Sequence, residues 1–394
     1  MPMKGTFSYL FLVLMAAGPV CTAQQPPAAR NADLRAADGV RLKASYYPAS
    51  KPGPGILLLH QCDHDRKIWD GLAKQLAAAG FHVVAFDLRG FGESGDQPHN
   101  QGNAGPIEPA EEMQKWPGDI DVALQYLKSQ PGVKAQPVGV GGGSCGVDNA
   151  IKTAMRHPEV KSLVLLAGPA DLKGRQFLRQ SRLPVFFAVA EDDQYHIMVP
   201  MTAFLYTISA SPGKKFERFK TGHHAAEIFS VHPELKTSIV NWFRTTLVKT
   251  PGQAPLATEV PPIPPKIHDW DLLEQPGGPA SLEQRLKAAR AKDPKAPFLQ
   301  EYIMDEFAYE HEQAGDARQA LEIMKLAAAA YPESPNVYDN LGDAYLAAGD
   351  KDSARNSEQK ALELLPSDKV FTPEQHAAIK ASAEEKLKKL GADQ

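Results

Sequence analysis

The sequence predicts an α/β protein, in which a doubly wound, mostly parallel sheet is followed by a small all-α domain of helical repeats. Between residues 32 and 249, short runs of successive apolar residues alternate with amphipathic stretches. Such runs are typical of strands covered on both faces, and their alternation with helices indicates a parallel sheet between two helical layers. Five runs carry the pattern, at residues 56–59, 83–86, 138–140, 163–166 and 185–189. Beyond residue 280 the pattern is purely helical and repeats itself.

The composition is that of an ordinary globular chain. Of 394 residues, 43% are apolar and 23% are charged, and the formal net charge is -4. The length allows two or three domains, each with its own core. Lys and Arg are scattered, which argues against the basic face of a nucleic-acid-binding protein. No apolar run reaches the ~18 residues of a membrane span, so we expect no integral membrane protein.

Residues 1–23 are predicted to be a cleavable secretory signal. Lys4 precedes an apolar run at residues 7–17, and small residues lead up to Ala23, after which we place cleavage. We therefore expect the mature chain in the periplasm or outside the cell. The alternatives are an uncleaved anchor and a lipoprotein attached through Cys21, although valine before that cysteine fits the lipoprotein pattern poorly.

Three segments are expected in the mature chain: a first domain at residues 32–249, a proline-rich linker at 250–279, and helical repeats at 280–394. The linker region holds eight prolines between residues 251 and 279. Such a stretch favours neither helix nor interior strand. Trp270 within it suggests that part of the linker docks on a domain.

The helical segment contains an internal repeat with an offset of 34 residues. Four sets of residues recur at this offset: Gly315-Asp316 and Gly349-Asp350, Ala320 and Ala354, Ala327 and Ala361, and Pro332 and Pro366. The second copy resembles the tetratricopeptide repeat, in which small residues let paired helices approach closely. The residues that carry this resemblance are Tyr338, Leu341, Gly342 and Tyr345. We expect a terminal capping helix at residues 373–390.

Residues 142–146 (GGSCG) lie between a predicted strand and a predicted helix. A serine on such a tight turn needs glycines two residues to either side, because side chains there would collide. The segment resembles the nucleophile elbow of the α/β-hydrolase family, and the chain is similar to relatives of the dienelactone hydrolase type. Residues 87–94 (DLRGFGES) resemble another turn of the family, and residues 58–62 (LLHQC) lie where the family has its oxyanion loop. Gln61 departs from the glycine that is usual there.

The resemblance implies a catalytic triad in the order Ser, Asp, His. Ser144 is then the nucleophile. We prefer Asp193 over Asp192 for its spacing from the preceding strand, and His224 over His223 for the residues that follow it. In this interpretation His224 takes and returns the serine proton, and Asp193 fixes the imidazole tautomer.

The same resemblance implies that the backbone N–H groups of Cys62 and Cys145 form the oxyanion hole. Cys145 is an alternative nucleophile, but an elbow centred on it would place Val147 where a small residue is required. A metal site built from the histidine, cysteine and aspartate residues at positions 60–65 is a further alternative. We disfavour it because side chains of such a loop radiate in different directions, and we expect no metal and no cofactor.

Cys62 and Cys145 are the cysteines that remain after cleavage of the signal. By the resemblance both lie at one oxyanion, so the distance between them suits a disulfide. Two buried free thiols are the favoured interpretation, and a disulfide in an exported protein is the alternative.

The sequence thus predicts a secreted or periplasmic serine hydrolase that cleaves an ester, thioester, lactone or amide through an acyl-enzyme on Ser144. The alternative is an inert hydrolase fold that acts as an adaptor through its repeats. The expected partners are a small acyl substrate and a protein or peptide bound by the repeats. Only about 16 residues separate Gly168 from the strand at 185, which leaves no room for a large lid. Residues 95–115 are expected to shape one wall of the site, and Asp119 and Asp121 to be solvated at a helix start.

Overall fold

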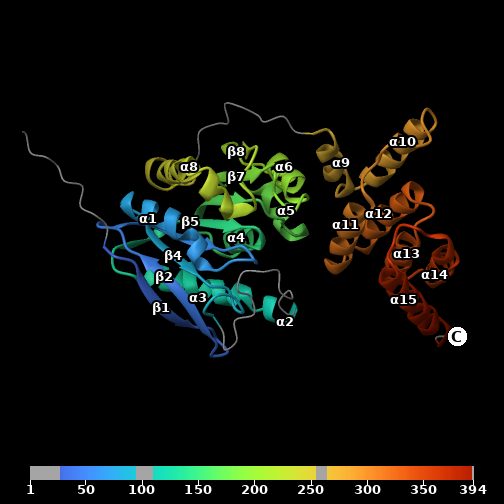
Figure 1. Cartoon of the computed structure of the whole chain (residues 1–394), viewed down its shortest axis with the longest axis horizontal. Coiled ribbons are helices and arrows are strands. Elements are labelled where there is room, and N and C mark those ends of the chain that lie inside the picture. The colour runs from blue at the N-terminus through green and yellow to red at the C-terminus, as the bar shows by residue number, and fades with distance from the viewer. Residues whose placement is uncertain (1–26, 95–109, 254–263, 393–394) are drawn as a thin grey trace, which may run out of the picture.

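The computed structural model describes residues 27–94, 110–253 and 264–392. The first domain is built on an eight-stranded sheet with the order β1-β2-β4-β3-β5-β6-β7-β8 (Figure 1). β1 and β4 are antiparallel to β2, and the other neighbouring strands are parallel. The strands are β1 (Arg30–Arg35), β2 (Arg41–Tyr47), β3 (Gly53–Leu59), β4 (His82–Phe86), β5 (Val133–Gly143), β6 (Val160–Leu166), β7 (Val185–Ala190) and β8 (Lys214–Phe219). The predicted doubly wound, mostly parallel sheet is confirmed.

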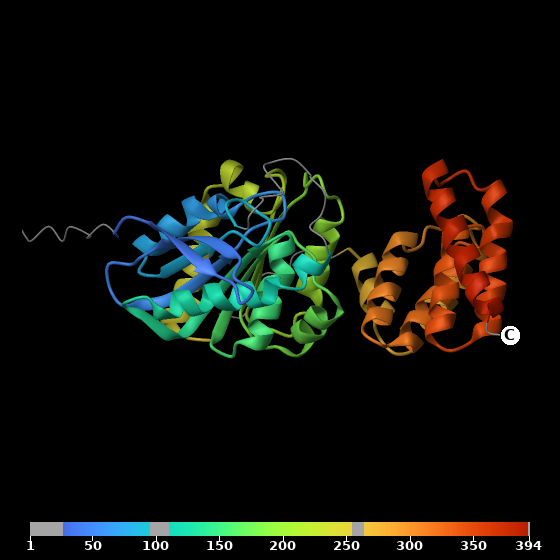
Figure 2. The same cartoon turned by 90° about the horizontal axis from the view of Figure 1, so that it is seen from below.

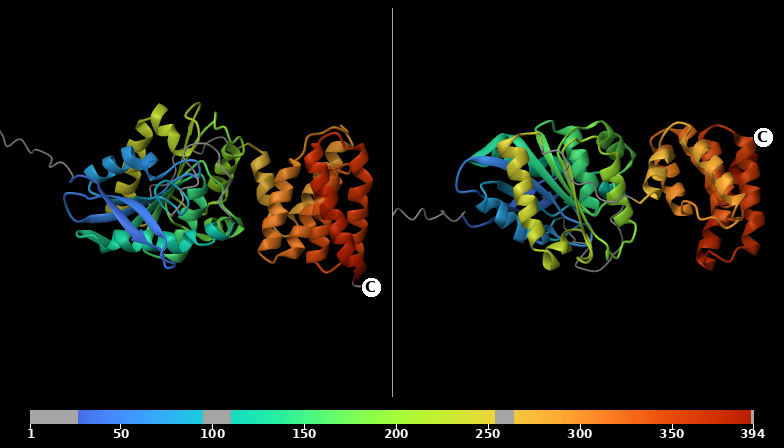
Figure 3. Two further views of the ribbon diagram at one scale, coloured as in Figure 1. Left: turned by 60° about the horizontal axis from the view of Figure 1, so that its bottom comes forward. Right: turned by 90° about the horizontal axis from the view of Figure 1, so that it is seen from above.

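Helices cover both faces of this sheet, as Figure 3 shows. Alternate residues of β3 belong to two cores: Ile56 and Leu58 lie in one, and Leu57 and Leu59 in the other. Residues of α1 (Asp70–Ala78) and α8 (Glu234–Phe243) complete the first core. The second core takes residues from α3 (Trp116–Ser129), α4 (Cys145–Arg156), α5 (Leu172–Gln180) and α6 (Met198–Ile208). An unbroken apolar strand is what such a two-sided burial requires.

Shorter helical turns connect these elements. They are η1 (Arg66–Trp69), α2 (Ala110–Met113), η2 (Ala225–Glu227), α7 (Ile228–Val231) and the π-helical turn η3 (Arg244–Lys249). The stretch between β6 and β7 forms α5, which has nine residues. The predicted signal at residues 1–23 and most of the predicted wall segment, residues 95–109, fall outside the described residues. No helix in the described part of the chain combines the length and the apolar character needed to cross a membrane.

Asp119 is buried, and the prediction of a solvated residue was wrong. Its side chain is 2% exposed, and its two oxygens accept hydrogen bonds of 2.9 Å from Nε and Nη2 of Arg89. Arg89 belongs to the turn after β4 and also reaches Asp38. Burial raises the pKa of the Asp119 carboxyl above its ordinary value. The partner Arg89 comes from a segment distant in the sequence, which a helix-start pattern does not contain, whereas the side chain of Asp121 is 41% exposed and pairs with Arg156.

The second domain is all helical, as predicted (Figure 2). Its helices are α9 (Lys266–Leu273), α10 (Gly278–Arg290), α11 (Glu301–Gln313), α12 (Ala317–Ala330), α13 (Pro335–Ala347), α14 (Lys351–Leu364), the short turn η4 (Leu365–Ser367) and α15 (Pro373–Ala392). The pairs α11/α12 and α13/α14 begin 34 residues apart at Glu301 and Pro335. Asp316 and Asp350 cap α12 and α14 in the same way, each accepting a hydrogen bond from the backbone N–H three residues on.

The expected linker is partly helical, because α9 lies within residues 250–279. The prolines nearest to α9 precede it, so they do not interrupt its hydrogen bonds. Ile267, Trp270 and Leu273 on α9 are buried. The ring of Trp270 packs edge-on against Phe204 of α6, with centroids 5.7 Å apart, and so joins the two domains.

A buried ion-pair cluster lies at the same junction. Arg175 of α5 is 1% exposed and contacts Glu274, just after α9, and Glu310 of α11. Its Nη1 also donates to the carbonyl of Ala170 in the loop before α5. Arg179, one turn further along α5, pairs with Glu274 at 2.7 Å. Both carboxylates thus come from the helical domain and both guanidinium groups from the first domain. The ion pairs therefore join the two domains at this junction.

Candidate active site

Ser144 stands between β5 and α4 in a backbone conformation that few residues adopt. Its φ is 52° and its ψ is −122°, and α4 begins at the next residue. A Cβ atom on Gly142 would lie 2.0 Å from the carbonyl oxygen of Gly146, and one on Gly146 would lie 2.4 Å from that of Leu59. Side chains at either position would therefore displace the backbone. The two glycines let the strand, the serine turn and the helix approach this closely.

His224 and Asp193 form a buried pair. His224 follows β8 and is 1% exposed, and Asp193 follows β7 and is 0% exposed. Nδ1 of His224 donates to Oδ2 of Asp193 at 2.8 Å, and the other carboxylate oxygen accepts the backbone N–H of Tyr195 at 2.8 Å. Because both oxygens are occupied, the carboxylate holds the imidazole in one orientation.

The neighbouring pair, Asp192 and His223, lies at the surface. The side chain of His223 is 62% exposed and that of Asp192 is 33% exposed. Asp192 accepts the backbone N–H of His223 at 2.9 Å, which braces the turn before His224. The structure therefore brings together Asp193 and His224, and it does not bring Asp192 or His223 into the buried pair.

The loop that carries His224 after β8, called here the histidine loop, lies directly against the turn at Ser144, called the elbow. A Cβ atom on Gly143 would be 3.3 Å from the Cβ of Ala225, so the residue before Ser144 contacts the residue after His224. Within the described part of the chain, Oγ of Ser144 makes no hydrogen bond. Contacts of a catalytic serine often tighten only when substrate binds. Tyr195 packs edge-on against His224 with ring centroids 4.6 Å apart.

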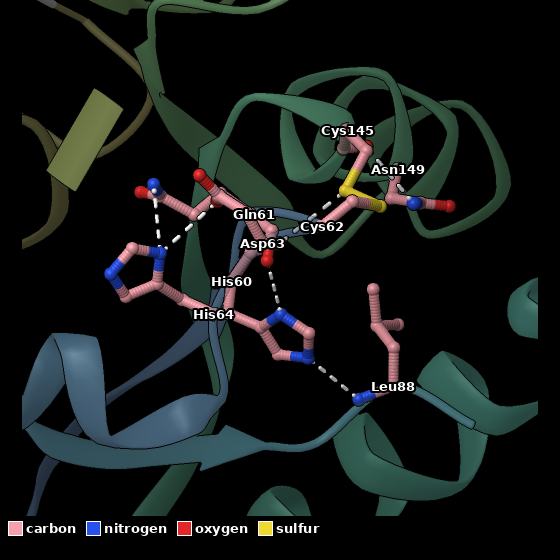
Figure 4. Close-up of a disulfide and its surroundings, with 8 residues drawn as sticks. All are labelled: His60, Gln61, Cys62, Asp63, His64, Leu88, Cys145 and Asn149. Atoms are coloured by element: carbon pink, nitrogen blue, oxygen red, sulfur yellow. Dashed lines mark hydrogen bonds and ion pairs between the residues drawn. A yellow bond between two sulfur atoms is a disulfide. The ribbon is translucent and has the colours of Figure 1, made fainter. Parts of the chain in front are cut away.

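A disulfide joins Cys62, in the loop after β3, to Cys145, the first residue of α4 (Figure 4). Their Cα atoms are 5.9 Å apart, within the range of ordinary disulfides. The favoured prediction of two free thiols is therefore wrong, because the loop lies close enough to the helix start for the bond. Among the described residues the backbone N–H groups of both cysteines have no hydrogen-bond partner. With its sulfur in this bond, Cys145 is not available as a nucleophile.

Gln61 lies in the loop after β3, called the oxyanion loop after the family resemblance, and connects it to the histidine loop. The side chain is 0% exposed, and its Oε1 accepts the backbone N–H of Ala226 at 3.0 Å. Its Nε2 lies 3.3 Å from Nδ1 of His64. Sequence reasoning treated Gln61 only as a departure from glycine and missed this role. The signal was the polar side chain itself, at a position next to the site where the resemblance expects none.

The side chains at positions 60–65 have separate partners, so they do not converge on a metal. Nε2 of His60 accepts the N–H of Leu88 at 2.9 Å, and its Nδ1 contacts the carbonyl of Gln61 (Figure 4). Burial lowers the pKa of His60, in keeping with a neutral ring. His64 turns toward Asp63, whose hydrogen bond raises the pKa of the His64 imidazole.

Comparison with known proteins supports the fold. Residues 51–189, a stretch that includes Ser144 but ends before Asp193, match the family model described as serine aminopeptidase S33. An uncharacterized protein of Mycobacterium tuberculosis is 34% identical over 111 residues, which are 27% of this chain and 40% of that protein. A thiohydrolase of Aspergillus aculeatus is 22% identical over 272 residues, which are 62% of this chain and 81% of that enzyme.

The chain thus spans about 40% of the length of the first of these relatives. Among solved structures, a dienelactone hydrolase from Anabaena variabilis superposes with a TM-score of 0.45 and 18% identity, covering 57% of this chain and all of that one. The strand order, the elbow between β5 and α4 and the family match agree with one another. The first domain has the α/β-hydrolase fold, and a helical domain follows it.

Proposed function

We propose that this α/β-hydrolase is a serine hydrolase that forms an acyl-enzyme on Ser144. The observation that carries the proposal is the buried hydrogen bond between His224 and Asp193, held against the strained turn that presents the serine. A buried carboxylate that fixes a histidine tautomer beside a nucleophile is the arrangement on which acyl transfer by serine depends.

The acylation step follows from these positions. Oγ of Ser144 attacks the carbonyl carbon of the substrate while Nε2 of His224 takes the hydroxyl proton. Nδ1–H of His224 stays bonded to Asp193, which stabilises the imidazolium. The carbonyl oxygen becomes an oxyanion and accepts hydrogen bonds from the backbone N–H groups of Cys62 and Cys145. The bond to the leaving group then breaks, and the leaving group receives the proton from His224.

Water completes the cycle by the same groups in reverse. His224 takes a proton from a water molecule, which attacks the acyl carbon, and Ser144 leaves as the free hydroxyl. We propose small acyl substrates, because the stretch between β6 and β7 holds only the nine-residue α5 rather than a large lid. Thioesters are the first class to test beside esters, lactones and amides, since a thiohydrolase aligns with 62% of the chain.

We also propose that residues 280–394 form a tetratricopeptide-type array that binds a peptide segment. The 34-residue offset of the helix pairs supports the repeat array. A pocket of about 350 Å³ between α11 and α13, lined by Tyr302 and Tyr309, supports peptide binding. Binding of library peptides should weaken in Tyr309→Ala.

We also propose that the enzyme is exported, because residues 1–23 have the pattern of a cleavable signal. N-terminal sequencing of the exported chain should then start at Gln24.

Labelling with a fluorophosphonate probe tests the catalytic proposal without a known substrate. We expect the mature protein to be modified once, on Ser144, and to hydrolyse short p-nitrophenyl esters. Ser144→Ala and His224→Ala should lose both reactions with little change in thermal stability, whereas the matched variant His223→Ala should keep them. A wild-type protein that takes up no probe would favour the inert adaptor instead.

A further inference from the structure

The disulfide connects the two residues whose backbone N–H groups form the proposed oxyanion hole. Cys62 lies in the loop after β3, and Cys145 is the first residue of α4, directly after Ser144. The bond therefore spans two segments that are 83 residues apart in sequence but meet at one point of the site. Figure 4 shows the two sulfur atoms between the loop and the helix start.

The loop is anchored on its other side by side chains that precede Cys62. His60 is held by the N–H of Leu88 at 2.9 Å, and Gln61 by the N–H of Ala226 at 3.0 Å. Neither contact involves Cys62 itself, whose N–H has no partner in the described part of the chain. The Sγ–Sγ bond is therefore a covalent tie between this residue and the helix that carries the other proposed donor.

We propose that the Cys62–Cys145 disulfide is a positioning element of the active site, which keeps the two oxyanion-hole amides at the separation needed to donate to one oxygen. This inference rests on the proposed function. Preorganised donors stabilise the transition state because they need no reorganisation when charge develops. Without the bond the Cys62 amide is free to move away from Cys145, and the transition state loses part of one donor while substrate binding is largely kept.

The bond is also open to chemical change, since both cysteines are only partly buried. A phosphine reductant in solution would convert the disulfide to two thiols and become a phosphine oxide, with the oxygen taken from water. The two thiols remain small apolar groups in the same place, so the folded domain does not depend on the bond for its packing. An oxidising compartment would keep the bond closed.

The test compares oxidised, phosphine-reduced and reoxidised wild-type protein, desalted before assay, with the double variant Cys62→Ser/Cys145→Ser. kcat and KM for a p-nitrophenyl ester and the inhibition constant of a boronic acid are measured at a temperature where circular dichroism shows all forms folded. We expect reduction to lower kcat roughly tenfold or more, to weaken boronic acid binding in parallel, and to leave KM within about threefold. Reoxidation should restore kcat, and the double variant should resemble the reduced enzyme and ignore the phosphine.

Three results would overturn the inference. If reduction lowers the melting temperature but leaves kcat and boronic acid binding unchanged, the bond is only a structural staple. If alkylation of the unreduced, denatured protein adds two groups, the bond does not form. If oxidised protein shows no Ser144-dependent turnover, the proposed function fails and this inference with it, whereas equal activity of oxidised and reduced protein removes the inference alone.

Discussion

Trp270 is a buried side chain of α9 that packs against the first domain, and replacing it with alanine should uncouple the two domains. It is 1% exposed, and its ring contacts Phe204 of α6 and Phe307 of α11 at centroid distances of 5.7 and 6.1 Å. Both phenylalanines are fully buried. Truncating a buried tryptophan to alanine costs about 3–5 kcal/mol, a large part of the roughly 5–15 kcal/mol that stabilises a domain.

Differential scanning calorimetry measures this loss. We expect wild-type protein to unfold in one dominant transition, and Trp270→Ala to show two, with the lower midpoint shifted down by on the order of 10 °C. A chain that ends at Pro265 serves as the reference for the hydrolase domain alone. We expect it to be less stable than the same domain in the full chain, because Phe204 loses its cover. Tyr309→Ala, at a side chain that is 57% exposed, is the matched control and should leave the trace unchanged.

A single, unshifted melting transition of Trp270→Ala would contradict this prediction. So would a chain ending at Pro265 that is as stable as the hydrolase domain of the full protein. Either result would mean that the buried aromatic contacts and the ion pairs of Arg175 add no net stability to the docked arrangement. A buried ion pair alone often contributes little, because desolvation offsets its Coulomb attraction. The prediction therefore depends on the aromatic side chains.

Three further perturbations test the site and the helical domain. Asp193→Asn should lower kcat for a p-nitrophenyl ester by about 10⁴, because it favours the wrong tautomer of His224, while Asp192→Asn should stay within a few fold; equal effects would contradict the assignment. Gln61→Ala leaves the buried N–H it serves without a partner, so kcat should fall more than KM changes, and a lower melting temperature alone would reduce Gln61 to a structural role. Burial raises the pKa of Glu358 to about 8, so the folded state keeps a proton that the unfolded chain releases above about pH 4.5. Urea unfolding should therefore show stability falling from pH 5 to pH 8, a slope that Glu358→Gln should make shallower, because Asp305 and Glu310, whose pKa values are raised to about 7, keep their share of it.

Local sequence patterns were sufficient where one segment determines its own structure. The apolar run at residues 56–59 has to be covered on both faces wherever it lies, and β3 is. The glycines at positions 142 and 146 follow from the shape of a single turn, and their contacts with neighbouring backbone show why no side chain fits. The 34-residue offset likewise repeats a single pair of helices, and the helix starts reproduce it.

Patterns failed where the partner comes from elsewhere in the chain. Asp119 was expected in solvent because its partner, Arg89, comes from the turn after β4 and not from its own helix. The disulfide needed the approach of two segments 83 residues apart, which the resemblance suggested without deciding how the sulfur atoms face. Trp270 indicated docking, but neither its partner Phe204 nor a helix among so many prolines is visible in a local window.

The distribution of these long-range contacts indicates how the proposed active site stays organised. Each of the three loops of the site is fixed by a contact from another: the disulfide ties the oxyanion loop to the elbow, Gln61 ties it to the histidine loop, and Asp193 ties the histidine loop to the end of β7. A lidded enzyme completes its site when the lid closes over the substrate. In the proposed mechanism the fixed loops leave little to be ordered on binding, so the transition state would meet donors already in place. Loosening one tie should therefore lower kcat before it raises KM, because the proposed chemistry needs all three loops in place at once.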